Sequence, residues 1–189
     1  MLEFLLDRGV HVDGEDRAWT PLDEAVYWAN IEIAERLLAR GARVRALSTA
    51  AGLGDSGAIE RFVGGGVLAS DAGPIGSPFP DTIPAGLAND PGSIVDHAFV
   101  MAIDAGQREA AARLLNEGVN VNAKPPGYHW RGTELHAAVW RGDRGLVEWL
   151  LEVGADPEIR DGMVGSDAAG WAVHHGHREL VELLTVDVR

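Results

Sequence analysis

The chain has 189 residues, of which 46% are hydrophobic, and a formal net charge of -13 at pH 7. It contains no cysteine, which excludes disulfide bonds, thiolate nucleophiles and metal sites built on sulfur. The negative charge disfavours nucleic acids and anionic membrane surfaces as partners. No apolar run approaches the roughly 20 residues of a membrane helix, and the first residues lack the basic start of a signal peptide. We therefore expect a cytoplasmic protein that binds neither nucleic acid nor membrane.

One helix-ending pattern recurs along the chain. It reads "FLLDRGV" from Phe4, "ERLLARGA" at 35–42, "ARLLNEGV" at 112–119 and "EWLLEVGA" at 148–155, with a weaker copy, "RFVGGGV", from Arg61. In each copy apolar residues close an amphipathic helix, and the Gly that follows suits a left-handed C-terminal cap. These segments predict a repeated helix.

A second shared segment precedes three of these helix ends and occurs once more near the C-terminus. It reads "TPLDEAVYWAN" from Thr20, "TELHAAVWRGD" from Thr133, "HAFVMAIDAGQ" from His97 and "DAAGWAVHHGH" from Asp167. Each copy predicts a short helix of small residues followed by a tight turn. The chain is therefore a series of helix pairs.

The combination of T-P-L-x-x-A, G-D or G-H, a Leu-Leu ending and G-A-D resembles the ankyrin repeat, whose period is about 33 residues. The resemblance implies an all-α fold: one ankyrin-repeat domain over residues 1–189, an α-solenoid of about five helix-pair units with short hairpin loops and one long insertion rich in Pro and Gly. We place a half repeat at 1–14, repeats at 15–44, 45–66, 97–129, 130–162 and 163–189, and the insertion at 67–96.

The stretch "GLGDSG", from Gly52 to Gly57, matches the G-x-G-x-x-G spacing of dinucleotide-binding domains. That fingerprint requires a buried strand before it, whereas the residues here are rich in Ala. The repeat register aligns Gly54 with Gly142, which lies in the turn of "WRGDRG". The motif is therefore predicted to be a turn between two helices, and no cofactor is expected.

Two regions depart from the repeat pattern. The insertion at 67–96 holds most of the prolines and lacks helical periodicity, so we expect a long finger or lid. The half repeat at 1–14 does not cover its own outer side, which makes it a candidate surface for a partner or for self-association.

The sequence offers little support for a catalytic site or a metal site. The cluster of His174, His175 and His177 is interrupted by Gly176 and has no neighbouring carboxylate to complete a metal site. His136 occupies the position at which the family's His bonds to the backbone of the neighbouring repeat. Paired acids such as Asp13, Glu15 and Asp16, or Asp161 and Asp167, are expected to form turns and helix caps. We therefore predict no catalytic residue, no metal and no cofactor.

The positions that face the concave groove of an ankyrin stack carry an unusual number of large side chains. Trp, Tyr and Arg are the residue types enriched at interaction hot spots. Trp171, by contrast, is assigned to the core. The predicted partner-binding residues are Trp19, Tyr27, Trp28, His129, Trp130, Trp140, Arg141, Met163, Val164, His174 and His175.

These observations favour a non-catalytic protein-interaction module with a protein partner, which the acidic charge predicts to be basic. Three alternatives remain open, and one of them is a purely structural module that fixes the spacing of neighbouring domains. In a GC-rich bacterial genome, which the content of Ala, Gly and Arg indicates, the chain would serve as an immunity protein or antitoxin against a basic toxin. The third alternative is a small-ligand site beneath the insertion that uses Asp96 and His97.

Overall fold

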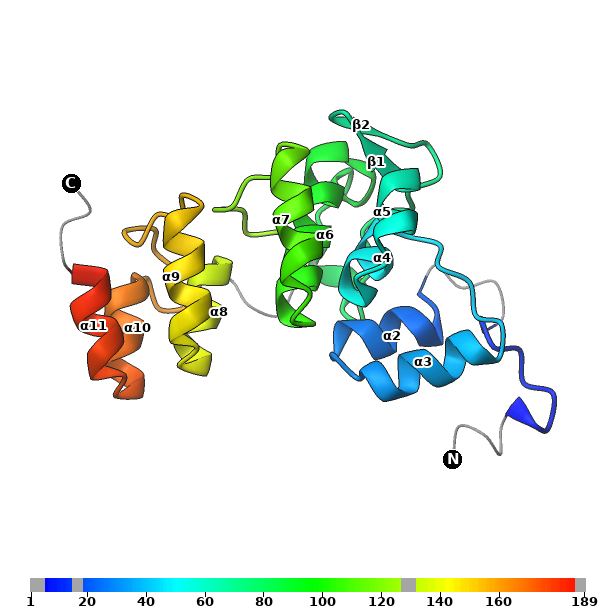
Figure 1. The fold of residues 1–189 in the computed structure, drawn as a ribbon, viewed down its shortest axis with the longest axis horizontal. Coiled ribbons are helices and arrows are strands. Elements are labelled where there is room, and N and C mark those ends of the chain that lie inside the picture. Colours follow the sequence, from blue (N-terminus) through cyan, green and yellow to red (C-terminus); the bar gives the residue numbers. More distant parts are fainter. Residues whose placement is uncertain (1–5, 15–18, 127–131, 186–189) are drawn as a thin grey trace. The chain divides into compact units, whose positions relative to one another are not determined.

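The computed structural model describes residues 6–14, 19–126 and 132–185, and within them the chain forms antiparallel helix pairs (Figure 1). The helices are α2 (Pro21–Tyr27), α3 (Ile31–Ala39), α4 (Leu47–Leu53), α5 (Ser56–Phe62), α6 (Pro91–Asp104), α7 (Arg108–Asn116), α8 (Glu134–Arg141), α9 (Arg144–Glu152), α10 (Ala168–His175) and α11 (Arg178–Thr185). The predicted all-α class is confirmed. No helix in this described part is both long and apolar enough to cross a membrane.

The described residues fall into two compact units. Unit 1 comprises residues 6–119 and 125–126, with the helices α2 to α7. Unit 2 comprises residues 120–124 and 132–185, with the helices α8 to α11. Each unit has its own buried core, built around Phe62 and Phe99 in unit 1 and around Leu135 and Leu150 in unit 2.

The helix ends follow the sequence signals closely. Gly41, Gly118 and Gly154 follow α3, α7 and α9 and have a φ between 89° and 100°, as the left-handed cap requires. Gly66 does not cap a helix, because α5 ends at Phe62 with an extended residue, Val63, and Gly66 lies in the hairpin turn that follows. The expectation of a helix cap at Gly66 is therefore wrong. In "GLGDSG", α4 ends at Leu53, Gly54 is left-handed with φ 69°, and α5 begins at Ser56. The prediction of a turn between two helices is confirmed, and no buried strand precedes the motif among the described residues.

In unit 1, α4 packs directly on α6, and α2 packs on α4 (Figure 1). A methyl group at Gly52 of α4 would lie 2.3 Å from a side-chain carbon of Val26, so glycine permits this close approach of α2. Both ribbon views show the α2–α3 pair turned away from the direction of α4 and α5.

The loop before α2 is anchored to the chain after α3 through a buried carboxylate. Asp13 accepts hydrogen bonds from the backbone N–H and Nε of Arg43, each at 2.9 Å, and from Arg45 at 3.0 Å. Burial opposes ionisation of Asp13, but the bonds from Arg43 and the charges of both arginines hold its pKa below the usual value. The carboxylate therefore joins two loops that are about 30 residues apart and does not form the local turn or helix cap that the sequence predicts.

The insertion is a packed strap in this structure, so the expectation of a projecting finger is wrong. It begins with a short hairpin of β1 (Val63–Gly64) and β2 (Val67–Leu68) and contains two turns of 3₁₀ helix, η1 (Pro80–Thr82) and η2 (Leu87–Asn89). The carbonyl of Ala72 accepts a hydrogen bond from the N–H of Leu47 at 2.8 Å, and Ile75 is buried. Helix α6 begins inside the stretch that the sequence assigned to the insertion, because Asp90 caps it and Pro91 suits its first turn.

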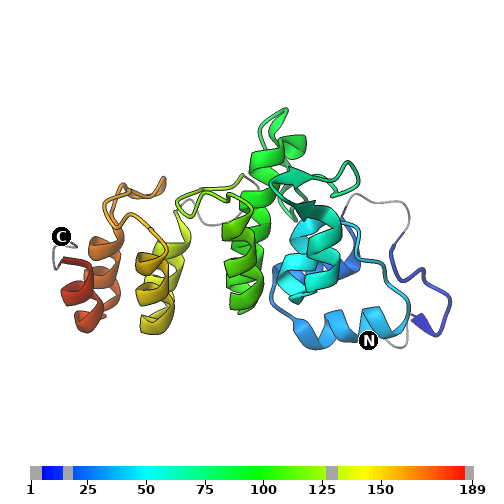
Figure 2. The same ribbon diagram turned by 45° about the horizontal axis from the view of Figure 1, so that its top comes forward.

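In unit 2, the α10–α11 pair stacks on the α8–α9 pair (Figure 2). The helices begin at side-chain caps, since Asp143 and Asp167 accept hydrogen bonds from N–H groups of the first turns of α9 and α10. Their apolar faces bury Val147, Leu180 and Leu184 between the pairs. This arrangement brings the C-terminal end of α10 close to the loop that precedes it.

Candidate functional site

A mainly apolar hollow of unit 2 lies between α10 and the loop before it. Its volume is about 430 Å³. Met163 and Val164 form the tip of the loop and are 58% and 76% exposed, which is unusual for large apolar side chains. The lining residues are Met163, Val164, Ser166, Gly170, Trp171, His174 and His175.

One buried carboxylate shapes this hollow. Asp161 accepts hydrogen bonds from the backbone N–H groups of Met163 at 2.6 Å, Val164 at 2.8 Å and Ser166 at 2.8 Å, and from the indole of Trp171 at 3.1 Å. Burial alone would raise the pKa of Asp161, but these four donors hold it well below the usual value. The loop tip and the Trp171 ring are therefore fixed relative to each other without a bound partner.

Two histidines, His174 and His175, line the hollow, and the ring of His177 stacks on that of His175. The ring of His175 lies 4.9 Å from that of His174 and 6.3 Å from that of His177, measured between centroids. Burial and the neighbouring positive forms of His174 and His177 lower the pKa of His175. Across the residues with described positions, no group of three potential ligands has the arrangement that a metal ion requires.

Unit 1 carries a second exposed aromatic group, the cluster of Trp19, Tyr27, Trp28 and Phe79. Tyr27 packs edge-on against Trp19 and Trp28, with centroids 5.7 and 5.1 Å apart. Phe79, from the insertion, packs edge-on against Trp28 at 6.4 Å. Glu24 holds both indoles, accepting a hydrogen bond from Trp19 at 2.5 Å and from Trp28 at 2.7 Å.

Comparison with known proteins identifies the repeats. The family model of the ankyrin repeat matches residues 18–49 and 132–162, which contain α2 and α3 in unit 1 and α8 and α9 in unit 2. The chain is an ankyrin repeat protein. No curated protein matches the chain in sequence. Ankyrin repeats are generally protein–protein interaction modules, and the family is typically non-catalytic.

The ankyrin register explains the buried His136. Its Nδ1 accepts a hydrogen bond from the N–H of Thr133 at 3.2 Å, and its Nε2 lies 3.2 Å from the carbonyl of Ser166, in the loop before the next helix pair. Burial lowers the pKa of His136, and the hydrogen bond to Ser166 offsets this only in part. The predicted structural role, bonding to the backbone of a neighbouring repeat, is confirmed.

Most of the predicted partner-binding residues that the structure describes reach the surface of their ankyrin unit. Trp28, Trp140, Arg141, Met163, Val164, His174 and His175 are exposed, and Trp19 is partly exposed. Tyr27 is an exception: only 3% of it is exposed, because the rings of Trp19 and Trp28 enclose it. The expectation that Tyr27 faces solvent is wrong. His129 and Trp130 lie outside the described residues.

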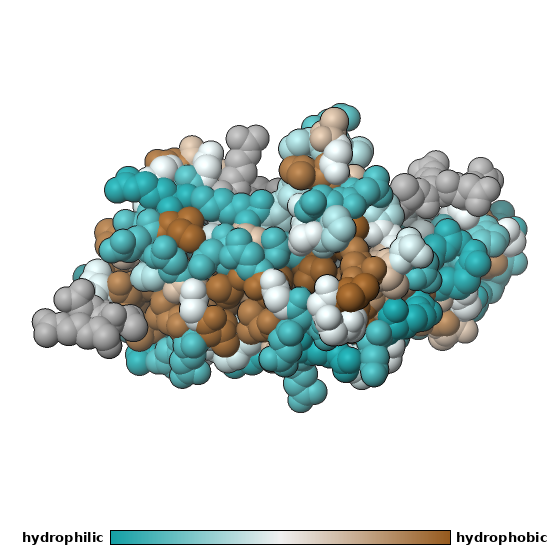
Figure 3. Space-filling model, turned by 90° about the horizontal axis from the view of Figure 1, so that it is seen from above, coloured by the Kyte–Doolittle hydropathy of each residue, from teal (hydrophilic) through white to brown (hydrophobic). Residues whose placement is uncertain are grey.

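The space-filling view agrees with this distribution. Hydrophobic residues (brown) reach the surface in patches between hydrophilic ones (teal) (Figure 3). In unit 1 the exposed large apolar residues include Trp28, Phe79 and Val67, and in unit 2 they include Trp140 and Met163. Each ankyrin unit therefore presents its own candidate surface.

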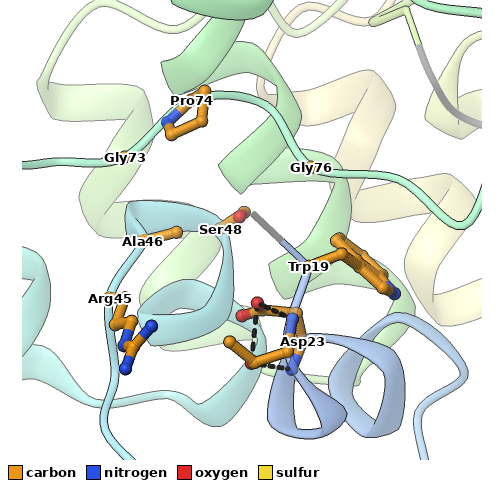
Figure 4. A pocket seen from close by; sticks show the side chains of 9 residues that line it. Trp19, Asp23, Arg45, Ala46, Ser48, Gly73, Pro74 and Gly76 are labelled. Carbon is orange, nitrogen blue, oxygen red and sulfur yellow. Dashed lines mark hydrogen bonds between the residues drawn. The ribbon is translucent and has the colours of Figure 1, made fainter. Parts of the chain in front are cut away.

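A smaller cavity, of about 210 Å³, lies beside the insertion (Figure 4). Its walls come from the start of α2, the start of α4 and the insertion backbone, and its lining residues are Trp19, Thr20, Asp23, Arg45, Ala46, Ser48, Gly73, Pro74 and Gly76. His97 is not one of them. It is fully buried in α6, and burial lowers its pKa to about 4.

Sequence reasoning missed three residues that shape the two surfaces. Glu24 and Phe79 were not selected, and Trp171 was assigned to the core alone, although its ring lines the hollow of unit 2. Glu24 and Trp28 are four residues apart at the end of α2, and this spacing could have predicted that their side chains are in contact. Phe79 carries no such signal, because the insertion brings it to Trp28 from far along the chain.

Proposed function

We propose that this ankyrin repeat protein is a non-catalytic module that recognises a partner protein through aromatic and apolar side chains of its helix pairs. The observation that carries the proposal is the hollow of unit 2, in which Asp161 holds an exposed loop tip beside Trp171. Rigid apolar side chains around a hollow bind a partner at low entropic cost, since the order already exists before binding. The occupant we propose is an apolar side chain of the partner, inserted between Met163 and Trp171.

Electrostatic complementarity favours a basic partner. The net charge of -13 accelerates encounter with a positively charged protein and disfavours acidic ones. An immunity protein or antitoxin that covers a basic toxin is one form of this function, and charge is its support. For a small-ligand function beneath the insertion, the support is limited to the cavity of Figure 4, so we retain protein recognition as the proposal.

The proposal is tested by affinity capture from the native host with matched variants. The double variant Met163→Ser, Val164→Ser removes both exposed apolar side chains at the loop tip while leaving Asp161 and its acceptor oxygens in place. The control is Val67→Ser, which removes a comparably exposed valine from β2. A partner retained by the wild type and the control but lost from the double variant supports the proposal. A partner retained equally by all three would place recognition elsewhere.

A further inference from the structure

The aromatic cluster of unit 1 combines exposed rings with a carboxylate. Trp28 is 52% exposed and Phe79 is 42% exposed, although large aromatic side chains usually bury most of their surface. The two rings are nearly perpendicular, at 85°, and belong to parts of the chain far apart in sequence. The two rings therefore lie together only because the folded chain brings the insertion beside the end of α2.

Glu24 is held in place at the edge of these rings. One of its oxygens accepts the indole hydrogen of Trp19 and the other accepts that of Trp28. A carboxylate has about four acceptor positions, so two indole donors leave acceptor capacity for a further donor. The side chain is only partly buried, so part of it remains open to solvent.

The side of Glu24 that a partner would use follows from the neighbouring cavity. The chain's own Arg8 lines an open cavity of about 610 Å³ together with Trp19 and Glu24. Trp28 does not line that cavity. The exposed ring of Trp28 lies outside this cavity and donates its indole hydrogen to Glu24, so an exposed ring and a negative charge lie side by side there.

We propose that Trp28, Phe79 and Glu24 bind an arginine side chain of a basic partner, with the guanidinium lying against the Trp28 ring and donating to Glu24. The face of an indole is electron-rich and attracts cations. A guanidinium is planar, stacks on aromatic rings and donates hydrogen bonds in its own plane, so it suits a ring beside a carboxylate better than an ammonium does. The acidic chain supplies the long-range attraction. This inference rests on the proposed function and adds the chemistry of the partner.

The test uses short peptides and the full chain. The probe is a blocked glycine peptide with one central arginine, and its matched control carries citrulline, which has nearly the same shape and no charge. Binding is followed through the indole N–H signals of Trp19 and Trp28 in a two-dimensional proton–nitrogen spectrum, assigned with the variants Trp19→Phe and Trp28→Phe. We expect the Trp28 signal to shift with a dissociation constant on the order of 1–10 mM for arginine and no saturable shift for citrulline.

Variants locate the charge that matters. Glu24→Gln keeps an acceptor oxygen but removes the charge, and it should weaken arginine binding by roughly fivefold or more. Glu35→Gln, on the exposed face of α3, changes the net charge equally and should leave the affinity unchanged. Unchanged signals of the remaining indoles serve as the check on folding. The proposal is overturned if citrulline shifts Trp28 as arginine does, if neither peptide shifts it, or if both glutamate variants weaken binding equally.

The outcome is separable from that of the proposed function. If the captured partner is lost from the Met163, Val164 double variant while arginine fails to shift Trp28, protein recognition stands and the arginine site falls. If arginine binds at Trp28 and the Trp28→Ala variant no longer captures the partner, protein recognition and the arginine site are both supported. If arginine binds but no variant changes capture, the cation site stands and the proposed hollow of unit 2 falls.

Discussion

The carboxylate of Asp161 accepts the indole hydrogen of Trp171 at 3.1 Å, which ties a loop tip to the helix that follows it. The same carboxylate accepts three backbone hydrogens of the loop. Because one buried group orients both walls of the hollow in unit 2, its loss should affect stability and recognition together.

Asp161→Asn is expected to lower the free energy of unfolding by about 3 kcal/mol, since an amide has one oxygen where the carboxylate has two and its NH₂ group would face donors. Urea unfolding followed by tryptophan fluorescence measures the loss. Asp156→Asn is the control, because Asp156 is exposed and accepts a single hydrogen bond, from the N–H of Glu158 at 2.9 Å. Equal losses in the two variants would contradict the role assigned to Asp161.

The buried His97 should make the protein sensitive to mild acid. Burial lowers its pKa in the folded state from 6.5 to about 4, so between these values the unfolded chain binds a proton that the folded chain does not. Stability is then fully present above pH 6.5 and falls as the pH drops toward 4, by roughly 3 kcal/mol from this residue. His136 adds to the loss in the same direction, since burial also lowers its pKa.

Urea unfolding at a series of pH values measures this slope. His97→Gln removes the titrating group, so its stability should fall less steeply between pH 6.5 and 4 than that of the wild type, whatever the absolute stability. Ala98→Gly, in the same helix, lowers the stability without removing a titrating group, so it should keep the wild-type slope. A His97→Gln profile parallel to the wild type would show that His97 has the same pKa in the folded and unfolded states, which would contradict the effect of burial.

The repeat position of His136 is occupied by Asp23 in the first matched repeat, and the two side chains fit different neighbours. Asp23 accepts a hydrogen bond from the hydroxyl of Thr49 at 2.5 Å, whereas His136 faces the carbonyl of Ser166. Since Nδ1 of His136 accepts from the N–H of Thr133, its proton lies on Nε2 and is donated to that carbonyl.

His136→Asp should therefore destabilise the fold by about 3 kcal/mol, because it sets a carboxylate against a carbonyl oxygen in a buried site. His136→Gln keeps a donor and should cost about half as much. Thermal unfolding compares the two variants. A His136→Asp variant as stable as His136→Gln would indicate that the contact with Ser166 contributes nothing.

The helix pairs could be predicted from the sequence because their signals are local. Gly41, Gly118 and Gly154 have the left-handed conformation that their position after a helix requires, and Gly54 ends α4 as its alignment with Gly142 indicates. The same locality identified Asp161 and Asp167 as a turn former and a cap. The helical period of 3.6 residues and the Gly cap recur in several repeats, so the prediction of a helix in one repeat supports the same prediction in the others.

The surfaces could be predicted only in part, since they depend on contacts distant in sequence. The repeat register placed Tyr27 in the solvent-facing set, but the register does not show that Trp19 and Trp28 close over it. The position of Phe79 depends on the path of the insertion, for which the sequence offers no period. The sequence indicates a long insertion only through its amino-acid composition, and composition does not predict which residues the insertion packs against.

The packed insertion leads to a last prediction. A methyl group added at Gly76 would lie 2.5 Å from the ring of Trp19, closer than packed atoms approach, so Gly76→Ala must displace either the ring or the strap. We expect a loss of about 1–3 kcal/mol in the free energy of unfolding and a shifted indole signal of Trp19. The matched control is Gly64→Ala in β1, where the nearest atom, the carbonyl oxygen of Glu60, lies at an ordinary 3.7 Å.

The same variant separates a packed strap from a loose lid. If the strap packs on Trp19, Gly76→Ala should also make residues 67–90 more sensitive to limited proteolysis, because displacing the strap weakens the hydrogen bond that the carbonyl of Ala72 accepts from the N–H of Leu47. It should also weaken arginine binding at Trp28, since Phe79 is held by the same strap. A Gly76→Ala variant could instead match the wild type in stability, in sensitivity to proteolysis and in the indole signal of Trp19. That result would mean that the insertion does not rest on Trp19 and that Phe79 is not fixed beside Trp28.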